Sequence, residues 1–116
     1  MKYLITFNHV DGAWDQLSDE ERERHTVWLR EFVAELREKK NAELVFLSLP
    51  DDARTVRKHP GGHIEVSAGP ALSSTEFPGG YYIIEAESLA EAVTWAEKGR
   101  FMVGSNEVRQ ILDLSF

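Results

Sequence analysis

His25 is the residue of this sequence with the clearest potential for chemistry. It recurs at helical spacing with Leu29, Phe32 and Leu36, at a position where a leucine is expected. An imidazole held between a helix and a sheet titrates near neutral pH, so it could act as a general base or bind a ligand. The alternative is a core histidine that a backbone carbonyl satisfies. We therefore take His25 as the candidate catalytic residue and keep the packing interpretation beside it.

Further side chains are predicted to converge with His25 on one cleft. At about 1.5 Å per residue, His25 lies about 9 Å into its helix, level with the end of the first predicted strand. The antiparallel neighbour strand and the end of the second helix meet the same place. The candidate ligand-binding residues are His9, Tyr81 (or its neighbour Tyr82), Arg100 and Phe101. Such a cleft would suit a small, flat or anionic molecule; the alternative is that the aromatic rings are core and Arg100 is a solvated helix end.

No metal or cofactor is expected. The chain has no cysteine, which excludes thiolate metal sites and a cysteine nucleophile. His59 and His63 are four residues apart, but Pro60-Gly61-Gly62 lies between them, so no helix can hold both imidazoles on one face. A turn with two exposed histidines is the simpler interpretation.

Length and charge limit the class of protein. A chain of 116 residues predicts one domain, over 1–116, with about two thirds of its unfolded surface buried. Acidic residues outnumber basic ones 20 to 13, for a net charge of −7, which argues against binding nucleic acid or an anionic membrane. No apolar run of about 18 residues and no signal peptide is seen, so we expect a cytoplasmic protein.

The first half of the sequence predicts a strand, a long helix and a second strand. The first strand covers Lys2–Asn8. Ser18-Asp19-Glu20-Glu21 is a capping box that opens a helix to about Lys40, with Asn41 as a left-handed stop. The second strand, Glu43–Leu49, is apolar on both faces and is closed by Pro50. A hairpin from Thr55 to Ser67 follows.

The second half repeats the pattern. Tyr81–Ala86 is the strongest strand, and Ser88-Leu89-Ala90-Glu91 is a second capping box. The helix it opens should end at Gly99. Its predicted apolar stripe consists of Leu89, Ala92, Val93 and Ala96. A last strand is expected over Glu107–Leu114, with Val108, Gln110, Leu112 and Leu114 on one face.

Two β-α-β units with an inserted hairpin predict an α+β fold, a ferredoxin-like sandwich whose central strands are Lys2–Asn8 and Tyr81–Ala86. Two helices cover only one face of such a sheet. Because Leu44–Leu47 and Tyr81–Ile84 are apolar on both faces, the other face must also be covered. A second copy of the sheet is the simplest cover, which predicts a homodimer. The alternative is cover by the long loops between 51 and 78.

Gly79-Gly80-Tyr81-Tyr82-Ile83-Ile84-Glu85-Ala86, with Ser88-Leu89, Glu91-Ala92 and Trp95-Ala96 after it, resembles the YCII-related (DGPF-type) family. Met1-Lys2-Tyr3-Leu4, Thr55-Val56-Arg57 and Glu107-Val108-Arg109 resemble it too. The resemblance implies a ferredoxin-like fold that forms a dimeric α+β barrel. That superfamily includes small isomerases, cofactor-free oxygenases and haem-degrading enzymes.

The sequence departs from the family pattern at two places. The Asp-Gly-Pro-Phe of the family is Ala68-Gly69-Pro70-Ala71 here. One branch of the family pairs a histidine in the first helix with an aspartate just after the second; His25 fits the histidine, but the aspartate falls near Gly99. A His–Asp dyad is therefore not supported.

These observations favour a small dimeric YCII-like protein with a cleft for a small organic molecule, without a cofactor, in which His25 performs general acid–base catalysis. The alternatives are a non-catalytic module that binds a ligand or a partner, and a haem-binding relative.

Overall fold

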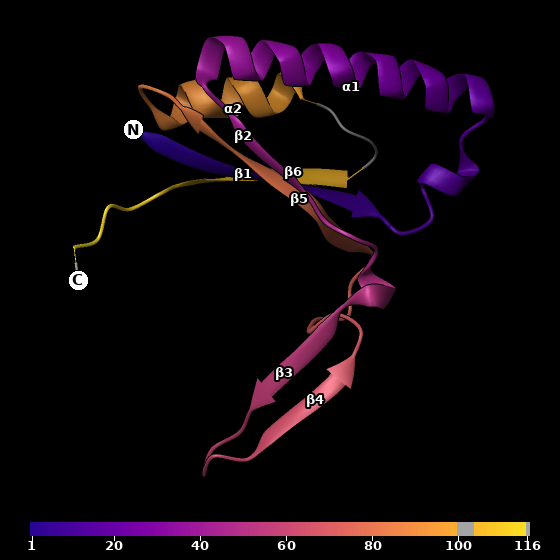
Figure 1. Ribbon diagram of the computed structural model, residues 1–116, viewed down its shortest axis with the longest axis vertical. Coiled ribbons are helices and arrows are strands. Elements are labelled where there is room, and N and C mark those ends of the chain that lie inside the picture. Colours follow the sequence, from indigo (N-terminus) through magenta and orange to yellow (C-terminus); the bar gives the residue numbers. More distant parts are fainter. Residues whose placement is uncertain (100–103, 116) are drawn as a thin grey trace.

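The computed structural model describes residues 1–99 and 104–115 and shows a ferredoxin-like α+β fold, as predicted (Figure 1). Both helices lie on one side of a four-stranded antiparallel sheet in the order β2-β5-β1-β6. The elements of this layer pair are β1 (Lys2–Val10), α1 (Asp19–Lys40), β2 (Glu43–Phe46), β5 (Glu76–Glu85), α2 (Leu89–Lys98) and β6 (Gly104–Gln110). Short 3-10 helices, η1 (Trp14–Gln16) and η2 (Pro50–Asp52), lie in the connections.

The ends of α1 are those that the sequence predicts. The Ser18 hydroxyl accepts a hydrogen bond from the Glu21 amide at 3.1 Å, and the Glu21 carboxylate accepts one from the Ser18 amide at 3.0 Å. Asn41 has φ 50°, so it ends the helix in the left-handed conformation. The cap at Ser18 and the stop at Asn41 depend only on residues that are close in sequence, so both could be predicted without knowledge of the fold.

The second capping box is only half formed. Ser88 accepts from the Glu91 amide, but the Glu91 carboxylate accepts from the amide of Glu87 instead of Ser88. The same carboxylate pairs with Lys40 of α1, so it serves the contact between the helices as well as the cap.

The predicted stripe of α2 is wrong at two positions. Leu89 and Val93 are exposed, whereas Trp95 joins Ala92 and Ala96 in the core. The ammonium of Lys98 lies 4.3 Å from the centre of the Trp95 ring, and that of Lys40, at the end of α1, lies 5.7 Å from it. The buried Trp95 side chain therefore packs at the ends of both helices. A tryptophan buries more apolar area than a leucine, and its packing decides the rotation.

Strand β5 begins earlier than predicted, at Glu76, and continues through the glycine pair. Phe7 is opposite Gly80 and Asn8 is opposite Pro78, which makes Gly79 an extra, unpaired residue in a β-bulge. A Cβ atom at Gly80 would lie 2.2 Å from the carbonyl oxygen of Val45, so only glycine allows β2 and β5 to approach here. The residues just before the predicted strand are therefore part of a bulged strand.

The last strand is shorter than predicted. Strand β6 ends at Gln110, which is opposite Tyr3, and the Ile111 amide donates to the carbonyl of Lys2. Beyond that point β1 has no further residue to pair with. Leu112 and Leu114 are consequently exposed rather than part of the sheet.

The core fills the space between the helices and the sheet. Its largest fully buried side chains are Ile5, Phe7, Leu36, Tyr82 and Ile84. The opposite face, which we call the open face, has no helix over it. Opposed pairs there are Leu4 with Ile83 and Thr6 with Tyr81, and Val45 of β2 is opposite Tyr81. The open face is apolar at Leu4, Val45, Tyr81 and Ile83, and it also carries Thr6, Glu43, Glu107 and Arg109.

The predicted hairpin forms a sheet of its own, β3 (Arg54–Lys58) paired with β4 (Ile64–Ala68). It extends from the sheet on the side away from the helices (Figure 1). No helix in the described part of the chain is long and apolar enough to cross a membrane.

Candidate functional site

A pocket of about 610 Å³ opens where the first half of α1 faces the end of β1. The segment that joins β2 to η2 makes its opposite wall. The pocket is lined on its apolar walls by Phe7, Val10, Trp14, Leu29, Phe46, Leu47, Leu49 and Phe77, and its polar lining includes His9, His25, Thr26, Asp11, Asp15 and Asp51. This is the end of the molecule at which the sequence placed the cleft.

His9 is held in the pocket by the bulge in β5. A Cβ atom at Gly79 would lie 2.2 Å from Cδ2 of His9, so the imidazole occupies the space that the missing side chain leaves. The ring centre is 5.6 Å from that of Phe7 and 6.4 Å from that of Phe77. The Nδ1 atom is buried and has no hydrogen-bond partner among the described residues. A buried polar atom without a partner costs free energy, so His9 is held here by packing and not by a hydrogen bond at this nitrogen.

His25 lies in a row of aromatic side chains along α1. Its ring centre is 5.8 Å from that of Trp14 and 5.5 Å from that of Trp28. Trp28 in turn stacks on Phe32 at 5.4 Å. His25 is half-buried, so it is neither enclosed in the core nor turned out to bulk solvent.

Both histidines are uncharged at neutral pH. Burial lowers the pKa of His9, and the nearby His25 lowers it further by repulsion between the charged forms. Burial also lowers the pKa of His25. Neutral imidazoles can accept a proton or a hydrogen bond, as a general base or an acceptor must.

The structure brings together only part of the predicted site. His9 and His25 share the pocket, as the sequence suggests. Tyr81 lies across from Thr6 on the open face, so it does not line the pocket, and Tyr82 is buried in the core. Arg100 and Phe101 lie outside the described residues.

Sequence reasoning missed Trp14, Phe46 and the acidic side chains of the pocket. Trp14 belongs to η1, and the cation of Arg22 lies 5.6 Å from its ring while donating to its carbonyl. Phe46 packs against Phe7 at 5.6 Å. The place of Phe46 in the predicted second strand could have indicated that it lies at the pocket. Trp14 lies in the connection between β1 and α1, where the sequence has no periodic pattern that would predict its position.

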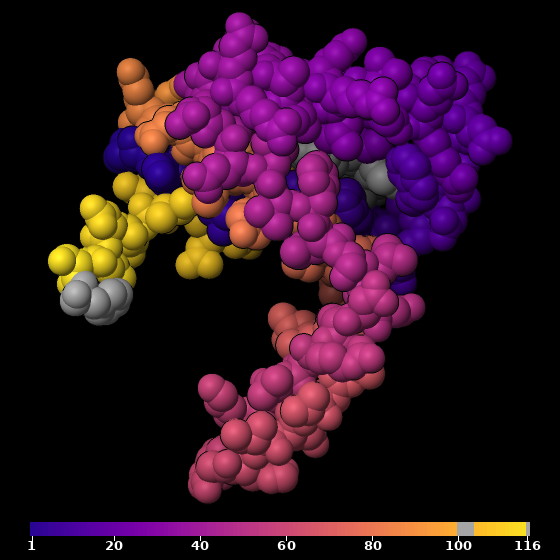
Figure 2. Space-filling view, in the orientation of Figure 1, coloured from indigo at the N-terminus to yellow at the C-terminus, as the bar shows by residue number. Residues whose placement is uncertain are grey.

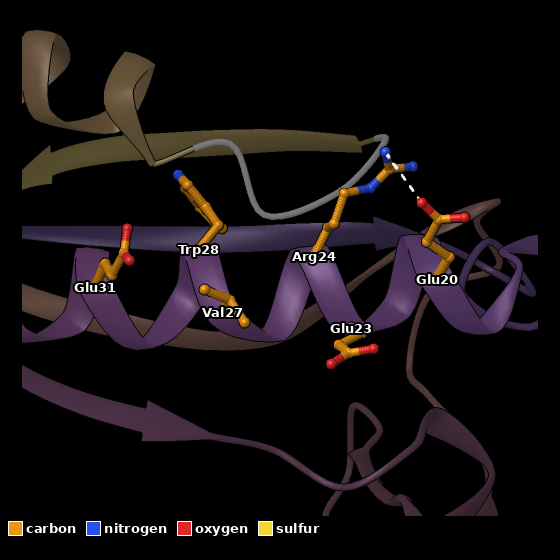
Figure 3. A pocket seen from close by; sticks show the side chains of 6 residues that line it. All are labelled: Glu20, Glu23, Arg24, Val27, Trp28 and Glu31. Carbon is orange, nitrogen blue, oxygen red and sulfur yellow. Dashed lines mark ion pairs between the residues drawn. The ribbon is translucent and has the colours of Figure 1, made fainter.

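A second hollow, of about 320 Å³, lies on the outer surface of α1 (Figure 3). Arg24 and Glu20 form an ion pair across it at 4.0 Å, while Glu23 points to the other side of the helix. The described residues that line it all come from this helix, and no described residue of another element faces them across the hollow.

Two further arrangements are absent from the described part of the chain. No group of three or more histidine or acidic side chains there could hold a metal ion. The position just after α2, where the related branch has an aspartate, is Gly99, and a Cβ atom there would lie 2.5 Å from the ring of Phe32. That ring occupies the room a dyad carboxylate would need.

The model of the YCII-related domain matches residues 1–115. No curated protein matches the chain. The family match covers all of the fold described above, including the glycine pair and the hairpin, and the chain therefore belongs to the YCII-related family.

Proposed function

We propose that this YCII-related protein binds a small, flat organic molecule in the pocket of His9 and His25. His25 then acts as the base of a cofactor-free acid–base reaction. The observation that carries the proposal is the pairing of two imidazoles, each with a lowered pKa, in one pocket with aromatic walls. Aromatic walls with a few polar groups are typical of sites for small molecules.

The roles of the two histidines follow from their surroundings. His9 is wedged against Gly79, so its imidazole is a fixed part of the pocket wall on which a flat ligand can pack. His25 is less enclosed and has aromatic rings on two sides, so its imidazole can take a proton from an acidic O–H or C–H of the ligand and return it elsewhere.

The charge of the lining favours a neutral or cationic ligand. Among the described lining residues, Asp11, Asp15 and Asp51 are acidic and none is lysine or arginine. Carboxylates and aromatic faces both attract cations. The anionic ligand suggested by Arg100 in the sequence is therefore the less favoured class.

The working form is a homodimer joined through the open face, with two pockets. Leu4, Val45, Tyr81 and Ile83 make an apolar area there that no helix covers. A two-fold pair of sheets would bury it and produce the α+β barrel that the family resemblance implies.

The second candidate function is binding without catalysis. No described carboxylate forms a hydrogen bond or an ion pair with His25, so nothing described orients or activates it as the third member of a triad would. A module that only binds its ligand needs no such group.

Ligand binding can be measured through Trp14, whose fluorescence reports on the pocket wall. We expect a library of aromatic amines, neutral heterocycles and aromatic carboxylates to give saturable quenching, strongest for the first two classes. His9→Gln and His25→Gln should weaken it about tenfold or more, because each removes an imidazole from the pocket. His63→Gln, on the hairpin, is the control that should leave it unchanged.

Saturable binding that is equal in wild type and in both pocket variants would contradict the proposed site. Turnover of a bound compound that His25→Gln abolishes, while His9→Gln retains it in part, separates catalysis from binding alone.

A further inference from the structure

The hairpin Arg54–Ala68, which we call the arm, stands apart from the rest of the protein. Its strands form a separate sheet. The hydrogen bonds at its base stay within its own segment: the Gly69 amide donates to the Ala53 carbonyl, and Thr55 donates to the Gly69 carbonyl at 2.7 Å. A two-stranded hairpin of this kind is marginally stable in water by itself.

The two faces of the arm differ in character. Val56 is opposite Val66, and Ile64 lies on the same face, opposite Lys58. These three apolar side chains are 56%, 64% and 58% exposed, respectively. The other face carries Arg57 opposite Glu65 and Thr55 opposite Ser67. Only the first face has a reason to be covered.

The molecular surface is larger than that of a compact monomer of this mass. The chain exposes 8471 Å². A compact monomer of this mass is expected to expose about 6,400 Å². The radius of gyration is 16.6 Å, against about 13 Å for a compact domain of this length. An excess of roughly 2,000 Å² per chain matches the interface of an obligate dimer.

Position and charge indicate what covers the arm. The arm extends on the side of the sheet away from the helices, and it bounds a hollow beneath the body of the molecule (Figure 2). A second copy packed on the open face would lie beside it. The arm carries three basic side chains, Arg54, Arg57 and Lys58, and one acidic one, Glu65, whereas the whole chain has a net charge of −7. A basic arm is therefore complementary to the acidic body of another copy.

We infer that the arm is a clasp, and that its face of Val56, Ile64 and Val66 packs against the second copy of this chain. By two-fold symmetry each copy contributes one arm and receives one. The inference rests on the proposed homodimer and adds to it a second contact surface, separate from the open face.

The arm is also joined to the pocket through the chain that precedes it. The connection that leads into the arm contributes Leu47, Leu49 and Asp51 to the pocket wall. Fixing the arm on a partner fixes this wall, so ligand binding should weaken when the arm is released.

The test compares two neighbouring positions of β4 that face opposite ways, Val66→Asp and Ser67→Asp. Both add one negative charge to the same exposed strand, but only the first places it on the clasp face. Wild type should have twice the chain mass of 13.2 kDa by light scattering. We expect Val66→Asp to raise the dimer dissociation constant about tenfold or more and Ser67→Asp to leave it nearly unchanged.

Hydrogen exchange of wild type provides a measurement that needs no variant. The amides of β3 and β4 should be protected at high protein concentration and exchange freely after dilution below the dissociation constant. A stable wild-type dimer whose Val66→Asp variant dissociates no more readily, or whose arm exchanges freely, would overturn the clasp and leave the homodimer standing. A wild type that is monomeric at every concentration would overturn both.

Discussion

His9 and His25 link the stability of the fold to pH. The pKa of both imidazoles is lowered by burial in the folded protein, so the unfolded chain binds more protons below about pH 6.5. Their contribution to stability is therefore fully present above the unfolded pKa and is lost as pH falls through it toward the folded values. We expect the urea midpoint of wild type to fall between pH 7.5 and pH 5.5.

Replacing both histidines tests whether they cause the pH dependence of stability. The double variant His9→Gln with His25→Gln should show a smaller drop in urea midpoint over the same pH interval. His63→Gln, in the turn region of the arm, should keep the wild-type drop. If all three proteins lost stability in parallel, the two pocket histidines would not be the source of the pH dependence.

Gly79 is predicted to set the position of His9. A methyl group there would overlap the imidazole, whose Cδ2 lies 2.2 Å from the Cβ position. Gly79→Ala should therefore turn His9 out of its place, lower stability by about 1–3 kcal/mol, as overpacking typically does, and weaken ligand binding. Urea unfolding and Trp14 quenching measure the two effects.

A double-mutant cycle identifies the cause. When His9→Ala is already present, Gly79→Ala should cost much less stability, because the clashing ring is gone. An equal cost in both backgrounds would mean that the bulge itself, and not the histidine, requires glycine.

At the scale of elements, the cap of α1 offers the most direct test. Ser18→Ala removes the hydroxyl that accepts from the Glu21 amide and should destabilise the protein by about 1 kcal/mol. Thermal or urea unfolding measures the change. Ser115→Ala, exposed near the C-terminus, is the control. No loss in Ser18→Ala would show that water replaces the cap without cost.

Local signals explain which elements the sequence could predict. The Ser18 cap, the Asn41 stop and the hairpin around Pro60-Gly61-Gly62 depend on neighbours in the chain, and each is formed as expected. The rotation of α2 depends on where Trp95 finds room against the sheet, and the end of β6 depends on where β1 begins. Neither the rotation of α2 nor the end of β6 can be predicted from a short stretch of residues.

The residues of the candidate site also fall into those that local geometry predicts and those that depend on tertiary packing. His9 and His25 could be placed together because a strand and the helix that returns along it have known rises per residue. The connections between the strands and helices contribute the other lining residues, Trp14, Asp11, Asp15 and Asp51. The path of a connection depends on tertiary packing, so the sequence did not predict these residues. Tyr81 lies opposite Thr6 on the open face and so does not line the pocket, because the register that decides its face cannot be predicted from composition.

At the scale of the whole molecule, the two apolar surfaces that no helix covers, the open face and the face of the arm, differ in position. The open face is central, whereas the arm is long and peripheral (Figure 1). In the proposed homodimer, the open face would supply the central contact and the arm a second contact at the edge. Both surfaces lie on the side opposite the helices, so one partner can cover them together.

The homodimer is tested on the open face by Ile83→Glu. Ile83 lies opposite Leu4 on β1 and opposite Glu43 on β2, so the new carboxylate would enter an apolar interface beside an existing one. We expect the variant to have the mass of one chain by light scattering at concentrations where wild type has twice that mass, with its helical circular dichroism retained. Val27→Glu, an equivalent change on the exposed surface of α1, should remain dimeric. An Ile83→Glu protein that stays fully dimeric would move the contact away from the sheet, and a wild type with the mass of one chain would leave the open face to be covered by something other than a second copy.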